Sequence, residues 1–404
     1  MAKTRKRVAS FSTVLELAVE RMRYVFSMFD RILVSFSGGK DSTVAFHIAL
    51  QVARELDRLP LDVFFLDEEA IPYETEEYVR RVAQNPDVRL TWYCLPVKHR
   101  NACSRLHPWW SPWDNDEEDL WVRPLPPEAV TTLPGFNTGG EPRDRLTIPQ
   151  TNGLIAPPTM GTVAMVMGIR AEESITRQRS VSFKKEDNYI IPYTDLTSQG
   201  NISKVYPIYD WKTADVWTAP RLFGWDYNKA YDAMDKCGVS PYDQRCSPAY
   251  GEEPLLRFHT YKKCFPALWD KMSVRVPGAN AALLYARTEI YGFKDIIGKP
   301  DHMTWEAYVL NYVNKYAEQE RVLVAKNIQS MINAHYSYTN DPILSEYDHP
   351  ITGVSWRQIA NIAMRGDFKG RRTSTVSRFG AKHAGRDIDE AFAAYHQARM
   401  EEGL

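Results

Sequence analysis

The sequence alternates between short apolar runs and longer stretches with helical spacing. Residues 44–52 place apolar positions on one helical face, and residues 73–83 are also predicted to be helical. The apolar runs that have the length of buried strands lie at residues 32–36, 61–66, 88–97 and 162–167, with a closing strand predicted at 206–211. Strands that alternate with helices are typical of a parallel sheet with helices on both faces. The pattern predicts an α/β fold whose ligands bind beyond the carboxyl ends of the strands.

Changes in the pattern indicate separate domains. An amphipathic helix is predicted within residues 1–30, an α/β domain in residues 31–240, and a helical, aromatic domain in residues 241–404. Residues 98–160 interrupt the α/β domain with a stretch rich in proline and tryptophan. A long insertion of this kind is more often functional than idle. It is interpreted either as a lid or partner surface, or as a packed excursion anchored by its tryptophans.

Composition limits the class of protein. The chain has 404 residues, of which 25% are charged and 44% hydrophobic, as is typical of a globular protein. A formal net charge of −1 gives no global attraction to nucleic acid or to an anionic membrane, so any such binding must be local. No stretch fits an export signal or a transmembrane span, which predicts a cytoplasmic location.

The cysteines agree with that location. There are 5 of them, an odd number, and none forms a Cys-x-x-Cys pair, which predicts free thiols in a reducing compartment. If the segment around residue 100 were helical, His99, Cys103 and His107 would line one face and could bind a metal. Ordinary packing is the favoured interpretation, because Pro108 and the surrounding aromatic residues favour an irregular loop.

One stretch, VSFSGGKDSTVAF at residues 34–46, carries the chemical signal. A strand stops at a glycine turn, and a helix begins directly after it. The main-chain N–H groups at the start of a helix attract anions, and Gly38 and Gly39 allow an anion to approach the main chain closely. The alternative interpretation is a plain turn between a strand and a helix.

The side chains of this loop favour the anion-binding interpretation. Lys40 adds a mobile cation, and Ser37 and Ser42 add hydroxyl donors. Asp41 would repel a phosphate unless a metal ion mediated the contact, so the loop predicts phosphate together with Mg²⁺. The loop differs from a Walker A loop, which requires Gly at Val34 and Ser or Thr directly after the lysine.

Polar residues also follow two other predicted strands. Asp67 begins an acidic triplet after the second strand, and Gly168, Arg170 and Glu173 follow the strand at 162–167. Arginine offers a planar, permanently charged fork for phosphate oxygens, so Arg170 is predicted to be a second phosphate clamp. For Arg177 and Arg179 taken alone, a surface position is the favoured interpretation.

Residues 365–386 are strongly basic, with seven Lys or Arg residues against one Asp. Such a run binds nucleic acid or a polyanionic cofactor tail in some proteins, whereas in others it is a solvated loop. Both interpretations stay open, with the solvated loop favoured.

Three motifs in this order resemble those of the phosphate-loop ATP pyrophosphatase superfamily: SGGKDS, VMGIRAEES and PIYDWKTADVW. The likeness lies in the branch that contains phosphoadenosine phosphosulfate (PAPS) reductases and the small subunit of ATP sulfurylase. DQRCSPAYGEEPLLRFH, residues 275–280 and SWRQIANIAMRGDF are similar to the C-terminal region of the PAPS-reductase-like proteins called immunoglobulin-binding regulator A. Together the resemblance spans most of the chain.

This resemblance implies a Rossmann-like, adenine nucleotide α-hydrolase-like fold with a helical C-terminal domain. It implies an enzyme that binds ATP and Mg²⁺ and splits ATP between the α and β phosphates. The residues that it implies in catalysis are Lys40, Asp41 and Arg170, with Asp41 as the metal ligand. Those implied in nucleotide binding are Ser35, Ser37, Gly38, Gly39, Lys40, Asp41, Ser42, Asp67, Gly168, Arg170, Glu173 and Arg177.

Two departures qualify the resemblance. PAPS reductases attack sulfur with the cysteine of a Glu-Cys-Gly-x-His motif, which is absent from this sequence, so reductive chemistry lacks its nucleophile. Cys246 is the nearest substitute, although a packed thiol is the favoured interpretation. The relatives usually carry Asp-Thr-Gly after the second strand, where this chain has Asp67, Glu68 and Glu69.

Three hypotheses follow. The first is an enzyme that transfers an adenylyl group from ATP to an acceptor, with sulfur metabolism as one setting. The second is a nucleotide-sensing regulatory or defence protein that acts through a partner protein encoded nearby. The third is a nucleic-acid thiolation enzyme that uses the basic run at 365–386.

Overall fold

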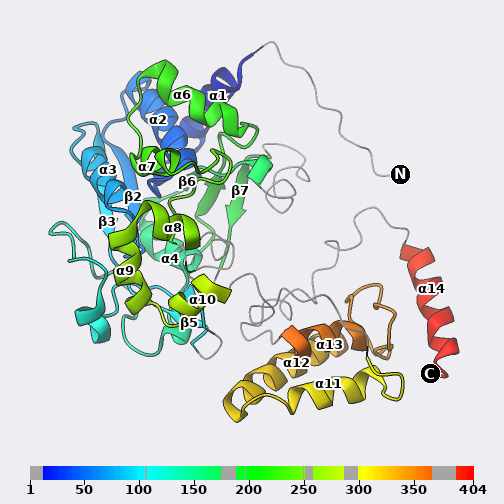
Figure 1. Ribbon diagram of the computed structural model, residues 1–404. Helices are drawn as coiled ribbons and strands as arrows, with labels where there is room; N and C mark the ends of the chain where they lie inside the picture. Colours follow the sequence, from blue (N-terminus) through cyan, green and yellow to red (C-terminus); the bar gives the residue numbers. More distant parts are fainter. Residues whose placement is uncertain are drawn as a thin grey trace. The chain divides into compact units, whose positions relative to one another are not determined.

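The computed structural model describes residues 12–104, 107–173, 188–195, 197–248, 250, 258–285, 299–365 and 388–404. These residues form two compact units (Figure 1), and each is described by itself. The first unit holds residues 8–101 and 109–279, and the second holds residues 102–108 and 280–404, in each case within the described ranges.

The first unit is built on a six-stranded sheet with the order β3-β2-β1-β6-β8-β7. All neighbouring strands are parallel except β7, which pairs antiparallel with β8. Val34 at the centre pairs with Val63 on one side and with Val166 on the other. The strand bounds are β1 Arg31–Ser35, β2 Leu61–Leu66, β3 Val88–Tyr93, β6 Val163–Met167, β7 Ile190–Tyr193 and β8 Ile202–Val205.

Two apolar cores cover the two faces of this sheet. One contains the inward side chains of Val34 and Val63 together with residues of α1 and α2, which lie on the same side of the sheet in Figure 1. The other contains Leu33 and Phe64, whose side chains point to the opposite face, together with Ile155 of α4. The helices concerned are α1 Val14–Met28, α2 Lys40–Glu55, α3 Tyr73–Ala83, α4 Ile148–Ile155, α6 Thr213–Phe223 and α7 Ala230–Lys236.

The predicted α/β fold with a mainly parallel sheet is confirmed. One strand differs from its predicted position: the strand beside β6 is β8 at Ile202–Val205, while residues 207–210 form a turn. The turn follows from Pro207, which has no N–H to donate to a sheet neighbour.

The insertion contributes a short antiparallel pair, β4 at His99–Arg100 with β5 at Trp109–Trp110. Its side chains pack onto the end of β2, where Trp113 is buried and its main-chain N–H donates to Glu69 at 2.8 Å. The indole N–H of Trp113 donates to the main-chain oxygen of Asp67 at 3.0 Å. The described part of the insertion is therefore a packed excursion.

The compact units divide after Ala279, whereas the sequence placed the domain boundary at residue 240. Helices α8 Phe258–Cys264 and α9 Pro266–Arg275 belong to the sheet unit. The last residue of α9, Arg275, forms a buried ion pair with Glu69 after β2, at 2.9 Å. This long-range pair attaches the two helices to the sheet.

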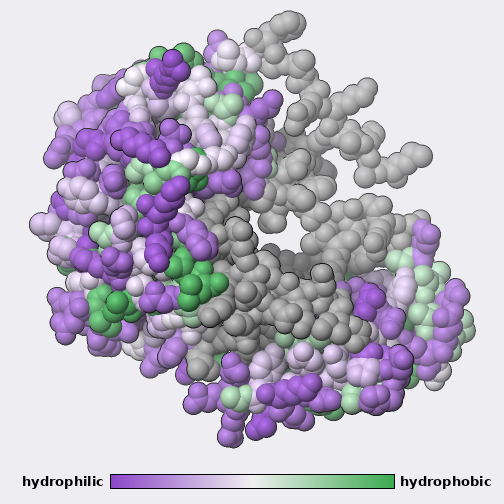
Figure 2. All heavy atoms as spheres, in the orientation of Figure 1, coloured by the Kyte–Doolittle hydropathy of each residue, from purple (hydrophilic) through white to green (hydrophobic). Residues whose placement is uncertain are grey.

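The second unit is helical, as the sequence predicts for the C-terminal region. An apolar core joins α11 Trp305–Val313, α12 Glu318–Tyr338 and α13 Trp356–Arg365. The remaining C-terminal helices are α10 Ala279–Tyr285 and α14 Ile388–Glu401. On the face shown in Figure 2, hydrophobic residues form separate patches among hydrophilic ones. Among the residues that the structure describes, no helix has the length and apolar content needed to cross a membrane.

Candidate functional site

The site begins at the turn between β1 and α2. Gly38 adopts φ of +68°, which side chains disfavour, and a Cβ there would lie 2.9 Å from a methyl group of Thr75. The buried side chain of Asn228 donates to the main-chain oxygen of Gly38 at 2.9 Å and to the Thr75 hydroxyl at 2.8 Å. Two elements distant in sequence therefore hold this turn in one conformation.

Helix α2 begins at this turn, and its N-cap residue Gly39 makes no side-chain cap. The hydroxyls of Ser37 and Ser42 lie 3.0 Å apart, and the Ser42 hydroxyl also donates to the main-chain oxygen of Gly39 at 3.0 Å. The main-chain N–H of Lys40 donates to the Tyr231 hydroxyl at 2.8 Å. The serines thus stabilise the turn, and the acidic residue in the first turn of α2 is Asp41.

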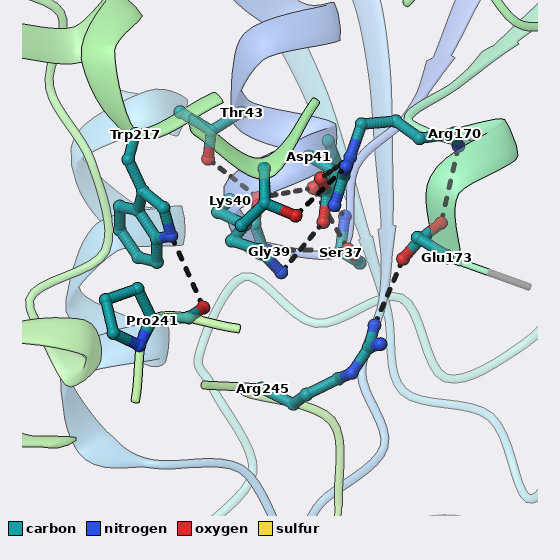
Figure 3. Close-up of polar contacts among 12 residues, drawn as sticks. Ser37, Gly39, Lys40, Asp41, Thr43, Arg170, Glu173, Trp217, Pro241 and Arg245 are labelled. Atoms are coloured by element: carbon teal, nitrogen blue, oxygen red, sulfur yellow. Dashed lines mark hydrogen bonds and ion pairs between the residues drawn. The ribbon is translucent and has the colours of Figure 1, made fainter. Parts of the chain in front are cut away.

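Lys40, Asp41 and Arg170 form a buried row of charges (Figure 3). The Lys40 ammonium lies 3.1 Å from one carboxylate oxygen of Asp41, and Arg170 donates to the other at 2.5 Å. Burial lowers the pKa of Lys40, as do the charges of Arg245 and Arg170, whereas Asp41 raises it. The ammonium of Lys40 and the guanidinium of Arg170 therefore flank the single carboxylate of Asp41 beside the helix start.

Arg170 is buried and its guanidinium is fully engaged. It bonds to Asp41, to Glu172 at 3.1 Å and to the Thr213 hydroxyl at 3.3 Å. The direct phosphate contact that the sequence predicts for Arg170 stays a prediction, because in this structure the side chain instead orients Asp41 and ties β6 to α6.

Gly168 allows β6 to approach the start of α2. A Cβ at this position would lie 2.4 Å from the carbonyl carbon of Asp41 and 2.5 Å from the nitrogen of Ser42, and both are main-chain atoms. Only glycine allows this approach, so Gly168 positions the loop. Ser35, the last residue of β1, lies beside Met167 in the sheet register.

Arg245 is a further cation of the site that sequence reasoning missed. Its guanidinium lies 3.0 Å from one oxygen of Glu173, and the other oxygen accepts the N–H of Arg170 at 3.3 Å. Figure 3 shows Glu173 between the two arginines. Arg245 lies in the stretch DQRCSPAYGEEPLLRFH, which carried part of the family resemblance but gave no role to this arginine.

A cavity of about 410 Å³ lies against Lys40 and the first turn of α2. Trp217 of α6 and Tyr227 and Tyr231 near α7 supply aromatic walls, and Arg221 supplies a cation. The volume lies within the range of about 300–1,000 Å³ that is typical of ligand sites. The sequence predicted the loop but not this cavity, because α6 and α7 lie far from the loop in sequence.

Asp67 and Glu69 are fully buried at the end of β2. One oxygen of Asp67 accepts the indole N–H of Trp92 at 2.7 Å and also pairs with Arg123. The other oxygen of Asp67 accepts the N–H of Glu69 at 2.8 Å. The structure thus gives Asp67 structural partners, and its predicted place near adenosine stays a prediction.

The thiol of Cys246 lies 3.6 Å from the Asn228 amide and is buried. Burial raises the pKa of this thiol to about 12. A thiol in this state is neutral at physiological pH and a weak nucleophile. The packed interpretation of Cys246 is therefore the better one.

The remaining predictions concern residues outside the described ranges and the metal sites. Arg177 and almost all of the basic run at 365–386 lie outside the described residues. Within the described ranges, no three His, Cys, Asp or Glu side chains are arranged to hold a metal, which includes the set of His99, Cys103 and His107. Both oxygens of Asp41 are paired with cations, so its carboxylate does not fit a metal in this geometry.

Two protein families match parts of this chain, and one of the matches includes the glycine loop. The phosphoadenosine phosphosulfate reductase domain family matches residues 31–123, and a domain of unknown function (DUF3440) matches residues 238–341. The chain belongs to the PAPS-reductase-like family of the adenine nucleotide α-hydrolase-like superfamily. It is 30% identical over 376 residues to the uncharacterized protein YbdN of Escherichia coli (strain K12), with 89% of this chain and 90% of that protein covered. The type called immunoglobulin-binding regulator A stays a prediction.

Similar solved structures are more distant. The FMN adenylyltransferase of Candida glabrata is 13% identical, with a TM-score of 0.35, and the match covers 56% of this chain and 62% of that one. The match therefore spans less than two thirds of the adenylyltransferase. The PAPS reductase of Candida auris is 18% identical, with a TM-score of 0.29, and the match covers 56% of this chain and 92% of that one.

Proposed function

We propose that this protein binds ATP with its phosphates at the start of α2 and cleaves it between the α and β phosphates. The adenylyl group passes to an acceptor, and pyrophosphate leaves. The observation that carries this proposal is the helix start itself, where α2 lacks a side-chain cap and the buried ammonium of Lys40 lies beside it. A phosphate group completes such a helix start as an acceptor of its N–H groups.

The charges around the loop support cleavage as well as binding. Negative charge builds up on the leaving pyrophosphate, and fixed cations that face it lower the barrier. Lys40 lies close enough to Arg245 and Arg170 for both of their charges to lower its pKa. Arg170 acts behind Lys40 and Arg245 by holding Asp41 in place.

The aromatic cavity supports a place for the nucleoside. Trp217, Tyr227 and Tyr231 offer flat apolar surfaces within the wall that also contains Lys40. An adenine ring packs well against such side chains. The main-chain N–H of Lys40 donates to the Tyr231 hydroxyl, so a bound phosphate would replace that hydroxyl as the acceptor.

We propose that Mg²⁺ enters the site bound to the phosphate oxygens of the nucleotide. Magnesium sites in nucleotide-binding proteins commonly combine few protein ligands with phosphate oxygens and water. Because both oxygens of Asp41 are paired with cations, no step of the reaction is assigned to the metal.

ATP binding and cleavage by a Lys40→Ala variant test the proposal. We expect its affinity for ATP to fall by at least about tenfold, equal to about 1.4 kcal/mol, and release of AMP and pyrophosphate to be lost. Calorimetry measures binding, and an anion-exchange assay measures the products. Lys204→Ala is the matched control, because Lys204 is also partly buried with a pKa that burial lowers, but it lies on β8. Equal binding and cleavage by Lys40→Ala and the wild type would refute the proposal, whereas tight binding without turnover would favour the nucleotide-sensing alternative.

A further inference from the structure

A second group of polar side chains lies beyond the carboxyl end of β2. Glu68 follows this strand, and His99 begins β4. The Nε2 atom of His99 lies 3.6 Å from a carboxylate oxygen of Glu68, which is too far for a hydrogen bond. The two side chains are 13% and 27% exposed, for His99 and Glu68 respectively, so the pair borders solvent on one side. An oxygen atom placed beside them can bond to both.

Four buried polar atoms on His99 and on residues after it have no hydrogen-bond partner among the described residues. They are Nε2 of His99, Nε1 of Trp110, and the hydroxyl oxygens of Ser111 and Tyr250. Trp110, Ser111 and Tyr250 are each at least 97% buried, with exposed fractions of 3%, 1% and 2%. Buried polar groups without partners cost stability, so these four call for a physical reason.

The rings of this group are in mutual contact. The Tyr250 ring centroid lies 4.3 Å from that of Trp110 and 5.5 Å from that of His99, and the last two are 6.0 Å apart. We call the group of Glu68, His99, Trp110, Ser111 and Tyr250 the β2-end cluster. An aromatic wall with several unpaired polar atoms is typical of a site whose ligand supplies the missing partners.

The charges of the surroundings indicate which ligands fit. Of the acidic triplet after β2, Asp67 pairs with Arg123 and Glu69 pairs with Arg275. Arg275 lies over the Trp110 ring, but Glu69 and Glu117 already bind its guanidinium. None of the five cluster members is a lysine or an arginine, while Glu68 would repel an anionic ligand.

Burial tunes the two titratable groups in opposite directions. It raises the pKa of Glu68 to about 7, with a further contribution from Asp67, and it lowers the pKa of His99 to about 4. His99 is therefore neutral near pH 7, where Glu68 exchanges its proton. A carboxylate with such a pKa is well matched to general-base work at neutral pH.

The β2-end cluster and the nucleotide loop lie at the same edge of the sheet. Strands β1 and β2 are parallel neighbours, so the loop and Glu68 follow strand ends at the same edge of the sheet. Burial is the largest influence that raises the pKa of Tyr261, and the nearby Cys246 and Glu68 raise it further. Cys246 in turn contacts Asn228, the residue that holds Gly38.

We infer that the β2-end cluster is the acceptor subsite and that it binds an uncharged hydroxyl compound. The inference rests on the proposed function. The hydroxyl oxygen forms a bond to the α-phosphorus of ATP while the bond from that phosphorus to pyrophosphate breaks. Pyrophosphate leaves with the electron pair, and the hydroxyl proton passes to the carboxylate of Glu68. The neutral groups of the cluster hold the oxygens of the compound, and the site disfavours sulfate.

Direct binding tests the ligand class in the full-length protein. With tryptophan labelled by ¹⁵N, the protein gives indole signals from 11 tryptophans, and the Trp110 signal is assigned by its loss in Trp110→Phe. We expect glycerol and ribose, as neutral hydroxyl probes, to shift the Trp110 signal in a saturable way, and sulfate to leave it in place. A shift with sulfate, or no shift with either neutral probe, would overturn the inference.

Turnover tests the role of Glu68. With ATP and glycerol, we expect Glu68→Gln to lower adenylyl transfer by about 100-fold while leaving the affinity for ATP unchanged. Glu128→Gln is the matched control, since it makes the same change at a carboxylate that pairs with Arg80 and lies outside the cluster. Unchanged transfer in Glu68→Gln would refute this inference alone, whereas a wild-type protein that does not bind ATP would refute the proposed function.

Discussion

At the scale of single residues, the candidate site depends on charges that the sequence separates widely. Lys40 and Asp41 are neighbours in the chain, but Arg170 and Arg245 reach them from other elements. The guanidinium of Arg245 is 29% exposed and its partner Glu173 only 5%. Arg245 is thus the arginine of this network that a phosphate can reach from solvent.

Arg245→Ala is therefore expected to weaken ATP binding. A hydrogen bond to a charged group contributes about 1.5–3 kcal/mol, so the loss corresponds to at least about tenfold in the dissociation constant. Arg143→Ala is the control, because Arg143 is 72% exposed and pairs only with Asp144. Titration with ATP at low salt measures both. Equal affinities for the two variants would show that Arg245 serves only to hold Glu173.

At the scale of elements, one close contact sets the position of the loop. The end of β6 meets the first turn of α2 at Gly168, where any Cβ would overlap main-chain atoms. Main chain cannot move aside as a flexible side chain can. The distance between the two elements therefore depends on the absence of a side chain.

We expect Gly168→Ala to lower the free energy of unfolding by about 1–3 kcal/mol, the usual cost of overpacking. It should also weaken ATP binding, because α2 must shift at its first turn. Urea denaturation and ATP titration measure the two effects. Gly139→Ala is the control, since a Cβ there lies 3.6 Å from its nearest neighbour. Normal stability and binding in Gly168→Ala would contradict the expected overlap.

At the scale of the whole molecule, stability depends on pH through buried histidines. The His47 ring stacks on Trp225 at 4.9 Å, and its Nε2 lies 3.0 Å from the main-chain oxygen of Asp226. Burial lowers the pKa of His47 to about 4, Asp226 opposes this shift, and Arg54 adds to it. The unfolded chain therefore binds more protons than the folded one between about pH 6.5 and 4. Over this range acid favours unfolding.

His47→Gln is expected to make the loss of stability between pH 6.5 and 4 less steep. Urea denaturation of both proteins at about pH 7.5, 6 and 5 measures the free energy of unfolding as the pH falls into the range where His47 titrates. The difference between wild type and variant should shrink as the pH falls. Parallel curves over this range would show that His47 titrates normally in the folded protein.

Much of the fold was predictable from local pattern. The runs around Val34, Val63 and Val166 are apolar because both faces of their sheet are buried, and such runs are visible without any knowledge of neighbours. The turn at Gly38 and Gly39 was equally visible in the sequence, because the positive φ of Gly38 is a local requirement that favours glycine.

Other features came from contacts between distant parts of the chain. The domain boundary lies after Ala279 because Arg275 pairs with Glu69, 206 residues away in sequence. Arg245 and Tyr231 lie far from the loop in sequence, so only the folded chain brings them to it.

The sequence by itself determined the alternation of strands and helices around the glycine turn, because periodicity and glycine act over a few residues. The tertiary structure decided which cations surround Lys40, that Asp67 is enclosed by the insertion, and that Glu68 meets His99. These outcomes depend on burial and on distances across the fold. Neither burial nor a distance across the fold can be read from a short stretch of sequence.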